Sequence, residues 1–329
     1  RLNTDSQKLE FYAQDQWWEM ATDPSDGVGS RVLWMGKFDD SSNVGVIDYN
    51  QVETFGDSID FGDLITVEYY GGSLASKTRG FYFGGETPMT DTIQFVEFST
   101  PGNGTDFGNL TNSTKYNPVG VSDNSRGIRG GGASSPGPGG VDTMDYWTMS
   151  SAGNAVDFGN LSVARRYLGP MNSPTRGIWC GGGVGGNPSP ATDTIDYITI
   201  QSTGNAVDFG NLTAASMFGN NGVVCSTTRG IHLQSYVGGT ETKGIDMVTM
   251  ASTGNAQDFG DLSDTVHRDA AGGSSQTRGL FAGGSEHPTY YNIISYVTIA
   301  TQGNATDFGD RTVAGSYCAG ASSNHGGLL

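Results

Sequence analysis

The chain has 329 residues, of which 52 are glycine and 3 are cysteine, and 34 acidic against 17 basic residues give it a net charge of −17. An acidic surface repels phosphate groups, so nucleic acid and anionic lipid are poor partners, and no apolar run is long enough for membrane insertion. The cysteines lack metal-site spacing, which predicts buried free thiols.

Residues 1–29 do not follow the pattern of the remaining chain. RLNTDSQKLEFYAQDQWWEM alternates apolar and polar residues after a polar turn, which predicts a short β-hairpin that exposes Trp17 and Trp18. Such a hairpin is marginally stable alone and needs a partner surface. Residues 21–30 are rich in turn formers and predict a linker. We therefore separate an N-terminal attachment hairpin with its linker, residues 1–29, from a repeat domain, residues 30–329.

Asp-Phe-Gly occurs six times in the repeat domain, at intervals of 46 to 51 residues. Its phenylalanines are Phe61, Phe107, Phe158, Phe209, Phe259 and Phe308. A second landmark, Arg-Gly after Thr or Ser, keeps the same interval at Arg79, Arg126, Arg176, Arg229 and Arg278, and Arg31 holds the equivalent place in the first unit. Units of about 50 residues cannot each bury a core, so neighbouring units must bury one another.

Each complete unit contains four strand-like segments, such as 166–172, 176–182, 193–200 and 206–212. The first unit lacks its leading segment, and the C-terminus has a spare one at 315–322. Closing the ring with this spare strand removes an exposed strand edge. We therefore predict an all-β fold, a six-bladed β-propeller in which the C-terminal strand pairs into the first blade.

Positions that recur in every unit are expected to have structural roles. The phenylalanines should fill the space between neighbouring blades, and the glycine after each should allow a positive φ or a close backbone approach. We expect the arginines to bind either strand-end carbonyls or the carboxylates of Asp-Phe-Gly. A ring of arginines lining an anion pore is the alternative. The aspartates concerned are Asp106, Asp157, Asp208, Asp258 and Asp307.

Catalytic chemistry has little support in the sequence. The four histidines are isolated, and the Asp-Phe-Gly motif lacks the other kinase motifs and occurs six times, so we predict no catalytic residue, no metal site and no cofactor. A glycosidase built from carboxylates of different blades stays open as an alternative. Asn109, Asn211 and Asn304 match glycosylation acceptors, but we interpret them as turn residues.

The variable segments lie between the second and third strands of each unit and are rich in Gly, Pro and Ser. In antiparallel blades these loops all emerge on one face of the ring, which therefore carries sequence diversity on a constant scaffold. Aromatic side chains suit contact with sugars or proteins. The candidate contact residues on the propeller are Trp147, His287, Tyr290 and Tyr291.

The repeat resembles the kelch propeller motif. Its glycine pair is matched by Gly182 and Gly183 and its tyrosine by Tyr197, whereas the phenylalanine of Asp-Phe-Gly stands in place of the kelch tryptophan. Blade five departs most, since Gln234 and Ser235 replace the glycine pair. The resemblance covers residues 30–323 and implies a kelch-like propeller, but it does not indicate a function.

Two further resemblances concern bacteriophages. The leader R-x-N-T-D-x-x-K-L-E-F-Y is similar to a small β-element at domain junctions of tail fibres, and the repeat DTIDYITI…STGNA-x-DFGNLT resembles repeats of virion proteins from aquatic bacteriophages. These resemblances imply a non-enzymatic virion structural protein on the extracellular particle surface, as a tail fibre, appendage or capsid-surface protein. It would form a homotrimer, attach to other virion proteins through its N-terminal segment and contact a host glycan or protein. The alternatives are a carbohydrate-binding propeller and a polysaccharide-degrading enzyme.

Overall fold

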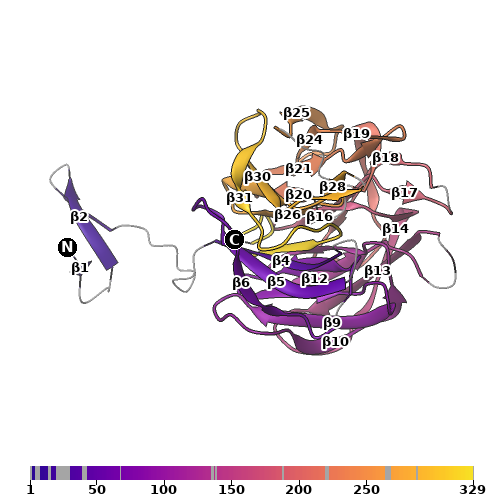
Figure 1. Cartoon of the computed structure of the whole chain (residues 1–329), viewed down its shortest axis with the longest axis horizontal. Coiled ribbons are helices and arrows are strands. Elements are labelled where there is room, and N and C mark those ends of the chain that lie inside the picture. The colour runs from indigo at the N-terminus through magenta and orange to yellow at the C-terminus, as the bar shows by residue number, and fades with distance from the viewer. Residues whose placement is uncertain are drawn as a thin grey trace.

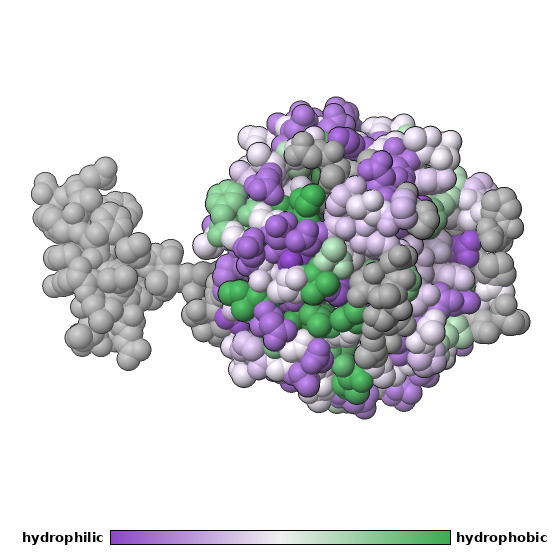
Figure 2. Space-filling view, viewed as in Figure 1, coloured by the Kyte–Doolittle hydropathy of each residue, from purple (hydrophilic) through white to green (hydrophobic). Residues whose placement is uncertain are grey.

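The computed structural model describes residues 2–3, 8–13, 16–19, 30–38, 43–66, 68–134, 137, 139–186, 189–218, 222–263, 268–286 and 288–328. The regular elements in these ranges are β-strands, which form small antiparallel sheets packed side by side (Figure 1). None of these residues forms a helix that could cross a membrane. On the side shown in Figure 2, hydrophilic residues are interspersed with hydrophobic ones, several of which gather near the middle of this face.

Six sheets are the blades of a β-propeller, each with four strands running from the axis to the rim. From the innermost strand outward, they are blade 1, β32 (Ala319–Ser322), β4 (Arg31–Phe38), β5 (Asn43–Gln51) and β6 (Ile59–Asp63); blade 2, β7 (Gly72–Ala75), β8 (Arg79–Phe83), β9 (Thr90–Glu97) and β10 (Thr105–Thr114); blade 3, β11 (Val119–Ser122), β12 (Arg126–Gly130), β13 (Val141–Thr148) and β14 (Val156–Arg166); blade 4, β15 (Gly169–Asn172), β16 (Arg176–Cys180), β18 (Thr192–Thr199) and β19 (Val207–Met217); blade 5, β20 (Val223–Cys225), β21 (Arg229–Leu233), β24 (Gly244–Thr249) and β25 (Gln257–Asp261); and blade 6, β26 (Ala271–Ser274), β27 (Arg278–Ala282), β30 (Ile293–Thr298) and β31 (Thr306–Asp310).

Short additional strands lie in the loops between second and third strands. β17 (Gly183–Val184) pairs with the end of β14, and β22 (Tyr236–Val237) with β23 (Thr240–Glu241) extends β19. β28 (Ser285–Glu286) and β29 (Thr289–Tyr290) form a separate two-stranded sheet. The loops of blades 4, 5 and 6 are thus partly ordered by strand pairing.

The N-terminal residues form their own antiparallel sheet of β1 (Leu2–Asn3), β2 (Lys8–Ala13) and β3 (Gln16–Glu19). β1 pairs antiparallel with β2, with Leu2 opposite Leu9, which is the predicted hairpin with its turn between residues 3 and 8. The prediction omitted β3, which pairs with the other edge of β2. Its sequence QWWE has two adjacent tryptophans and no apolar–polar alternation, which explains the omission.

The C-terminal strand closes the ring. β32 pairs antiparallel with β4, with Gly320 opposite Trp34, so blade 1 combines the last strand of the propeller with its first three. The last strand of the propeller therefore lies beside the first. Each innermost strand contacts the innermost strands of both neighbouring blades, in the cyclic order β7, β11, β15, β20, β26 and β32. The predicted closure is confirmed.

The described residues form six clusters in the hydrophobic core, and each cluster joins two consecutive blades. The cluster between blades 3 and 4, for example, combines Ile128 and Phe158 with Trp179 and Ile198. The six Asp-Phe-Gly phenylalanines each belong to such a cluster, and only 2 to 3% of each side chain is exposed. Their predicted position between blades is confirmed.

The glycine of Asp-Phe-Gly allows two blades to approach closely. Gly108 has a φ of +149°, and a Cβ there would lie 2.4 Å from the carbonyl oxygen of Gly153 in blade 3. The Gly153 N–H donates to the Phe107 carbonyl at 2.8 Å, and the strand pairing slips at this point as a β-bulge. The equivalent glycines of the other blades have the same conformation and make the same backbone approach. A side chain here would separate the two backbones.

The repeated arginines bind carbonyl groups of the following blade. The Arg176 guanidinium donates to the Met250 carbonyl at 3.0 Å and lies 4.8 Å from the ring centre of Tyr197. The equivalent bonds run from Arg31 to Phe98, Arg79 to Met149, Arg126 to Ile200, Arg229 to Ile299 and Arg278 to Val52. The carbonyl interpretation is thus confirmed, and the anion-pore alternative is wrong because these bonds direct the guanidiniums toward the neighbouring blade.

The expected pairing with the Asp-Phe-Gly aspartates is wrong. Those aspartates are exposed on the outermost strands, where charge discourages edge-to-edge pairing with another sheet. Only Arg79 among the six arginines forms an ion pair with a described carboxylate, Glu97, at 2.7 Å.

Of the asparagines interpreted as turn residues, Asn109 and Asn211 lie in outermost strands rather than in turns. Asn304 lies outside the strands and accepts a hydrogen bond from the Asp261 N–H at 3.0 Å.

Other aspartates, on the third strand of a blade, form the buried ion pairs. Arg165 of blade 3 binds Asp196 of blade 4, and the Ser162 hydroxyl donates to the same carboxylate at 2.5 Å. Arg129 and Asp145 are 2.8 Å apart, and the atoms of Arg311 and Asp48 are 3.4 Å apart. The paired side chains are at most 1% exposed. Burial lowers the pKa of Arg129 and Arg165, and the partner carboxylate opposes this.

Candidate binding face

One end of the ring, which we call the loop face, carries the loops between second and third strands. Because adjacent strands of a blade are antiparallel, the segments that enter the innermost strands lie at this same end. A residue with left-handed backbone stands there in each blade, although none of them is glycine. These residues are Tyr70, Tyr116, Tyr167, Phe218, Asp269 and Tyr317, with φ between +58° and +61°.

The strained conformation turns the chain from the rim of one blade to the axis of the next. Each such residue costs on the order of 1–3 kcal/mol, so its surroundings must hold it. The Tyr317 N–H donates to the Asp269 carbonyl at 3.0 Å, and the Asp269 N–H donates to the Phe218 carbonyl at 3.3 Å. The Tyr167 N–H likewise donates to the Tyr116 carbonyl at 3.4 Å. Backbone bonds between neighbouring blades thus fix these turns.

Five of the six turn residues are aromatic, and their rings contact one another. The ring centres of Tyr70 and Tyr317 are 4.1 Å apart, those of Tyr70 and Tyr167 are 5.9 Å apart, and those of Tyr167 and Phe218 are 4.6 Å apart. The ring centre of Tyr116 lies 5.6 Å from that of Tyr70 and 5.8 Å from that of Tyr167. We call these five residues the axial aromatic cluster.

Asp269 is the one acidic member of the set, and its side chain is fully buried. The Nε atom of Arg268 lies 3.3 Å from its Oδ2 atom. Burial, followed by the charge of Asp269, raises the pKa of Tyr70 and Tyr167, and the same two causes raise the pKa of Tyr317 to about 12. These three phenol groups are therefore neutral at physiological pH.

Cationic side chains lie over these rings. The Lys115 ammonium is 4.6 Å from the ring centre of Tyr116, and the Arg268 guanidinium is 4.2 Å from that of Phe218. Lys115 is also 3.4 Å from Glu86, and Arg268 is 3.7 Å from Glu241. Flat apolar rings therefore alternate with charged hydrogen-bonding groups, and the four side chains of these two ion pairs are 20 to 25% exposed.

The aromatic surface continues toward blades 1 and 6. Phe38 lies 5.3 Å from Tyr69 and 6.1 Å from Tyr290, measured between ring centres, and all three side chains are half-buried. The predicted contact residue Tyr290 therefore does lie on the loop face. Tyr291 is next to it and donates its hydroxyl to Glu286 at 3.3 Å.

The structure corrects one predicted contact residue. Trp147 is only 2% exposed and packs against Phe81 and Phe83 of blade 2, with ring centres 6.1 and 5.4 Å away. It is a core residue because its strand position points between blades. His287 lies outside the described residues. Trp17 and Trp18 lie in β3, but their side chains are outside the described part of the chain.

Sequence reasoning missed the axial aromatic cluster and the cations beside it. The signal was present, because an aromatic residue recurs in five of the six units just before the innermost strand. It was overlooked because the flanking residues differ from unit to unit, as in YYGGS, KYNPV and RYLGP. Only the ring arrangement shows that these residues meet at one place.

The described residues include buried titratable groups. Those residues contain no group of three or more His, Cys, Asp and Glu side chains that could hold a metal ion. Glu68, next to Tyr69, is 1% exposed, and its Oε2 atom has no hydrogen-bond partner among the described residues. Burial raises the pKa of Glu68 to about 7. His232 is fully buried, which lowers its pKa.

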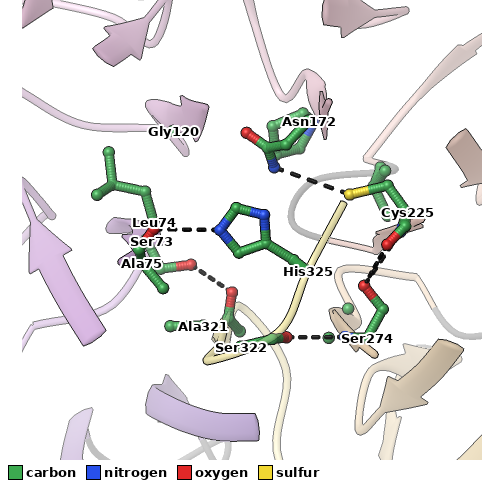
Figure 3. Close-up of a pocket in the computed structure, with 15 residues that line it drawn as sticks. Ser73, Leu74, Ala75, Gly120, Asn172, Cys225, Ser274, Ala321, Ser322 and His325 are labelled. Carbon is green, nitrogen blue, oxygen red and sulfur yellow. Dashed lines mark hydrogen bonds between the residues drawn. The ribbon is translucent and has the colours of Figure 1, made fainter. Parts of the chain in front are cut away.

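The opposite end of the ring is closed by the C-terminal segment. A polar cavity of about 40 Å³ lies on the axis between the innermost strands, and His325 contributes to its lining (Figure 3). The two ends of the propeller thus differ in composition. The loop face carries aromatic and charged side chains, whereas the opposite end is filled by the chain itself.

Fold and site together define a six-bladed β-propeller with one candidate binding face. Compared with known proteins by sequence, the chain matches no family and no curated protein at a significant level. The function must therefore be inferred from the propeller itself and from the resemblances of its repeats.

Proposed function

We propose that this chain is a non-enzymatic bacteriophage virion protein, whose kelch-like propeller contacts a host surface or a neighbouring virion protein through the loop face. It would lie on the particle surface as part of a tail fibre, an appendage or the capsid shell, attach through its N-terminal segment and assemble as a homotrimer. The resemblance of the repeats and of the leader to virion proteins supports the setting.

The proposal that the loop face binds a partner rests on the difference between the two ends of the ring. Contacts that hold the blades together recur with nearly the same residues in every blade. On the loop face, by contrast, the loops and the residues that flank the recurring turn aromatics differ between blades, and Tyr69, Tyr116 and Tyr290 remain partly exposed. A surface that folding alone maintained would be expected to repeat as regularly as the rest.

Purified particles from the source of this chain test the virion setting. We expect mass spectrometry to find the chain in stoichiometric amounts, and we expect antibodies against the propeller to label intact particles in electron micrographs. The absence of the chain from purified virions would refute the setting and leave only a binding propeller.

The binding face is tested with the purified protein and the intact host cells or virions. The double substitution Tyr69→Ser with Tyr116→Ser should weaken binding at least about tenfold, the loss expected when two aromatic contacts disappear. Val207→Ser, at a 51% exposed rim position, is the matched control and should bind normally. Equal affinities of the wild type, the double variant and Val207→Ser would show that the contact lies elsewhere.

A carbohydrate-binding propeller is the second candidate, favoured by one observation. Partly exposed tyrosine rings stand next to the ion pairs of Lys115 with Glu86 and Arg268 with Glu241, so stacking area and hydrogen-bonding groups are combined. This combination suits sugar rings with their hydroxyl groups. A glycan array should then give hits that Tyr116→Ser removes, and an array without hits would reject this candidate.

A further inference from the structure

The segment Asn324–Leu328 continues beyond β32 and crosses the end of the axis. It touches all six blades within five residues. The Asn324 amide donates to the Ser30 hydroxyl of blade 1 at 2.9 Å. The His325 ring lies 3.1 Å from the Ala75 carbonyl of blade 2 and 3.3 Å from the Ser122 hydroxyl of blade 3, and the His325 carbonyl accepts from the Gln276 amide of blade 6 at 2.9 Å. Gly326 packs against the backbone carbonyls of Asn172 in blade 4 and Ser226 in blade 5.

Both glycines of the segment are needed for this fit. A Cβ on Gly326 would lie 2.2 Å from the Ser226 carbonyl oxygen and 2.4 Å from that of Asn172. A Cβ on Gly327 would lie 2.1 Å from the Ser122 carbonyl oxygen. These neighbours are backbone atoms of three blades, so they cannot move aside without shifting the innermost strands. The following Leu328 is 2% exposed.

The hydrogen bonds of His325 require its neutral form. The Gly327 N–H donates to the Nδ1 atom of His325 at 3.0 Å, so Nδ1 must carry a lone pair. The ring proton is therefore on Nε2, which donates to the Ala75 carbonyl (Figure 3). A proton added to Nδ1 would face the Gly327 N–H, and two donors would then oppose each other.

We propose that Asn324–Leu328 is a latch that locks the axial ends of all six blades together, and that protonation of His325 releases it. The latch is distinct from ring closure, because β32 already completes blade 1 through its pairing with β4. Release would uncover the axial cavity at the end opposite the loop face. This inference does not depend on what the loop face binds.

The groups facing His325 set the pH range of release. The titratable groups are the carboxylate of Asp123, which follows β11, and the thiol of Cys225 in β20. Burial raises the pKa of the Cys225 thiol. Serine hydroxyls, the Asn172 amide, backbone groups and apolar side chains form the rest of the lining. Burial lowers the pKa of His325 to about 4, against the partial opposition of the Ala75 carbonyl and Asp123. Since an exposed histidine titrates near pH ~6.5, the latch should be fully held above that pH and lost as the pH falls through about 4.

The thiol of Cys225 reports the state of the latch. It is 3% exposed, lines the axial cavity and accepts a backbone hydrogen bond from Gly326, so an open latch uncovers it. Cys180 and Cys318 are fully buried and serve as internal controls. The experiment labels the purified chain with 4,4′-dithiodipyridine, a disulfide reagent that also reacts in acid, and identifies the modified cysteine by mass spectrometry.

In the wild type, labelling of Cys225 relative to the other two cysteines should rise at least about tenfold between about pH 7 and pH 4. Gly326→Ala should produce this rise already at neutral pH, whereas Gly102→Ala, where a Cβ meets no described atom within 4 Å, should not. His325→Gln should abolish the dependence on pH. If Gly326→Ala does not fold, the chain ending at Ser323 replaces it, with the same expectation at neutral pH.

Two results would overturn the proposal. One is simultaneous labelling of all three cysteines at low pH, which would indicate global unfolding. The other is a protected Cys225 in the chain that ends at Ser323.

Discussion

Among single residues, the arginine that starts the second strand of each blade shows how one side chain joins two blades. Arg176 covers Tyr197 of its own blade and donates to a carbonyl of the next. It does not neutralise the carboxylates of Asp-Phe-Gly, because those aspartates lie exposed on the rim. Its contribution is therefore a charge-assisted hydrogen bond and a ring contact, which is smaller than that of a buried ion pair.

Arg176→Ala should lower the free energy of unfolding by about 1–3 kcal/mol, since it leaves the Met250 carbonyl without its donor. A double-mutant cycle with Tyr197→Leu should give a coupling of about 0.5–1 kcal/mol from the cation–π contact. Chemical denaturation of the wild type, the two single variants and the double variant measures both the loss of stability and the coupling. A loss of about 3–5 kcal/mol would instead indicate a stranded partner charge.

Glu68 should make the propeller less stable as the pH rises. Burial raises its pKa from 4.5 to about 7, so the folded chain holds a proton that the unfolded chain releases, and stability is lost as the pH rises from 4.5 through 7. Glu68→Gln should therefore stabilise the protein near pH ~8, by at most about 3 kcal/mol, and have little effect near pH ~4. Melting temperatures of both proteins across this range test the sign, and an equal difference at both pH values would contradict it.

At the scale of the strand and its turn, the Asp-Phe-Gly bulge determines the spacing between blades. Backbone rather than side chains makes this contact, which explains why glycine recurs at this position in every blade. The turn of the following blade supplies both partners, a carbonyl that approaches the glycine and an N–H that binds the phenylalanine carbonyl.

The two sides of this contact give a matched pair of substitutions. Gly108→Ala should destabilise the protein by more than about 2 kcal/mol, because its Cβ would meet the Gly153 carbonyl oxygen at 2.4 Å. A Cβ at Gly153, on the other side, meets no described atom within 4 Å, so Gly153→Ala should change stability by less than about 0.5 kcal/mol. Similar losses for both variants would show that loop flexibility, not the approach of the backbones, explains the glycine.

The buried ion pair of Arg165 with Asp196 connects blades 3 and 4 in a different way. Arg165→Met should cost about 3–5 kcal/mol, because Asp196 would remain charged and buried without its cation. Adding Asp196→Asn should recover much of this loss, since the charge itself is removed. Blade 2 supports this expectation, as the neutral Gln94 occupies the equivalent position and binds Thr66. A double variant no more stable than Arg165→Met would contradict it.

In the whole molecule, six blades form one cooperative unit because each core cluster belongs to two of them. A missing contact at one junction would leave an open array with two unprotected ends. The closing strand β32 supplies that contact, and the latch then crosses the axis. Closure and latching should therefore differ in their effects on folding.

Two truncations separate closure from latching. Removing residues 315–329 takes away β32 and exposes the edge of β4. We therefore expect this shortened chain to melt without cooperativity and to aggregate. Removing residues 324–329 should lower the melting temperature by several degrees but leave a monodisperse protein. Calorimetry and size-exclusion chromatography distinguish these outcomes, and cooperative melting of the chain without 315–329 would refute the role of closure.

The amino-acid pattern alone was sufficient to predict the architecture. Six Asp-Phe-Gly units, four strand-like segments in each complete unit and a spare strand at the C-terminus indicated the blade number and the closure, since units that cannot bury a core alone must form a ring or an array. The position of the phenylalanines followed from the same reasoning, because a residue repeated in every unit serves packing.

The polar and aromatic contacts, by contrast, depend on how the ring brings distant segments together. The partner of Arg165 lies 31 residues away in another blade, and the axial aromatic cluster draws one residue from each of five units. Linear spacing contains no information on such contacts, because these residues are neighbours only around the axis. For the same reason the prediction for Trp147 was wrong. The latch Asn324–Leu328 could not be anticipated either, because its contacts with all six blades exist only where the blades meet at the axis.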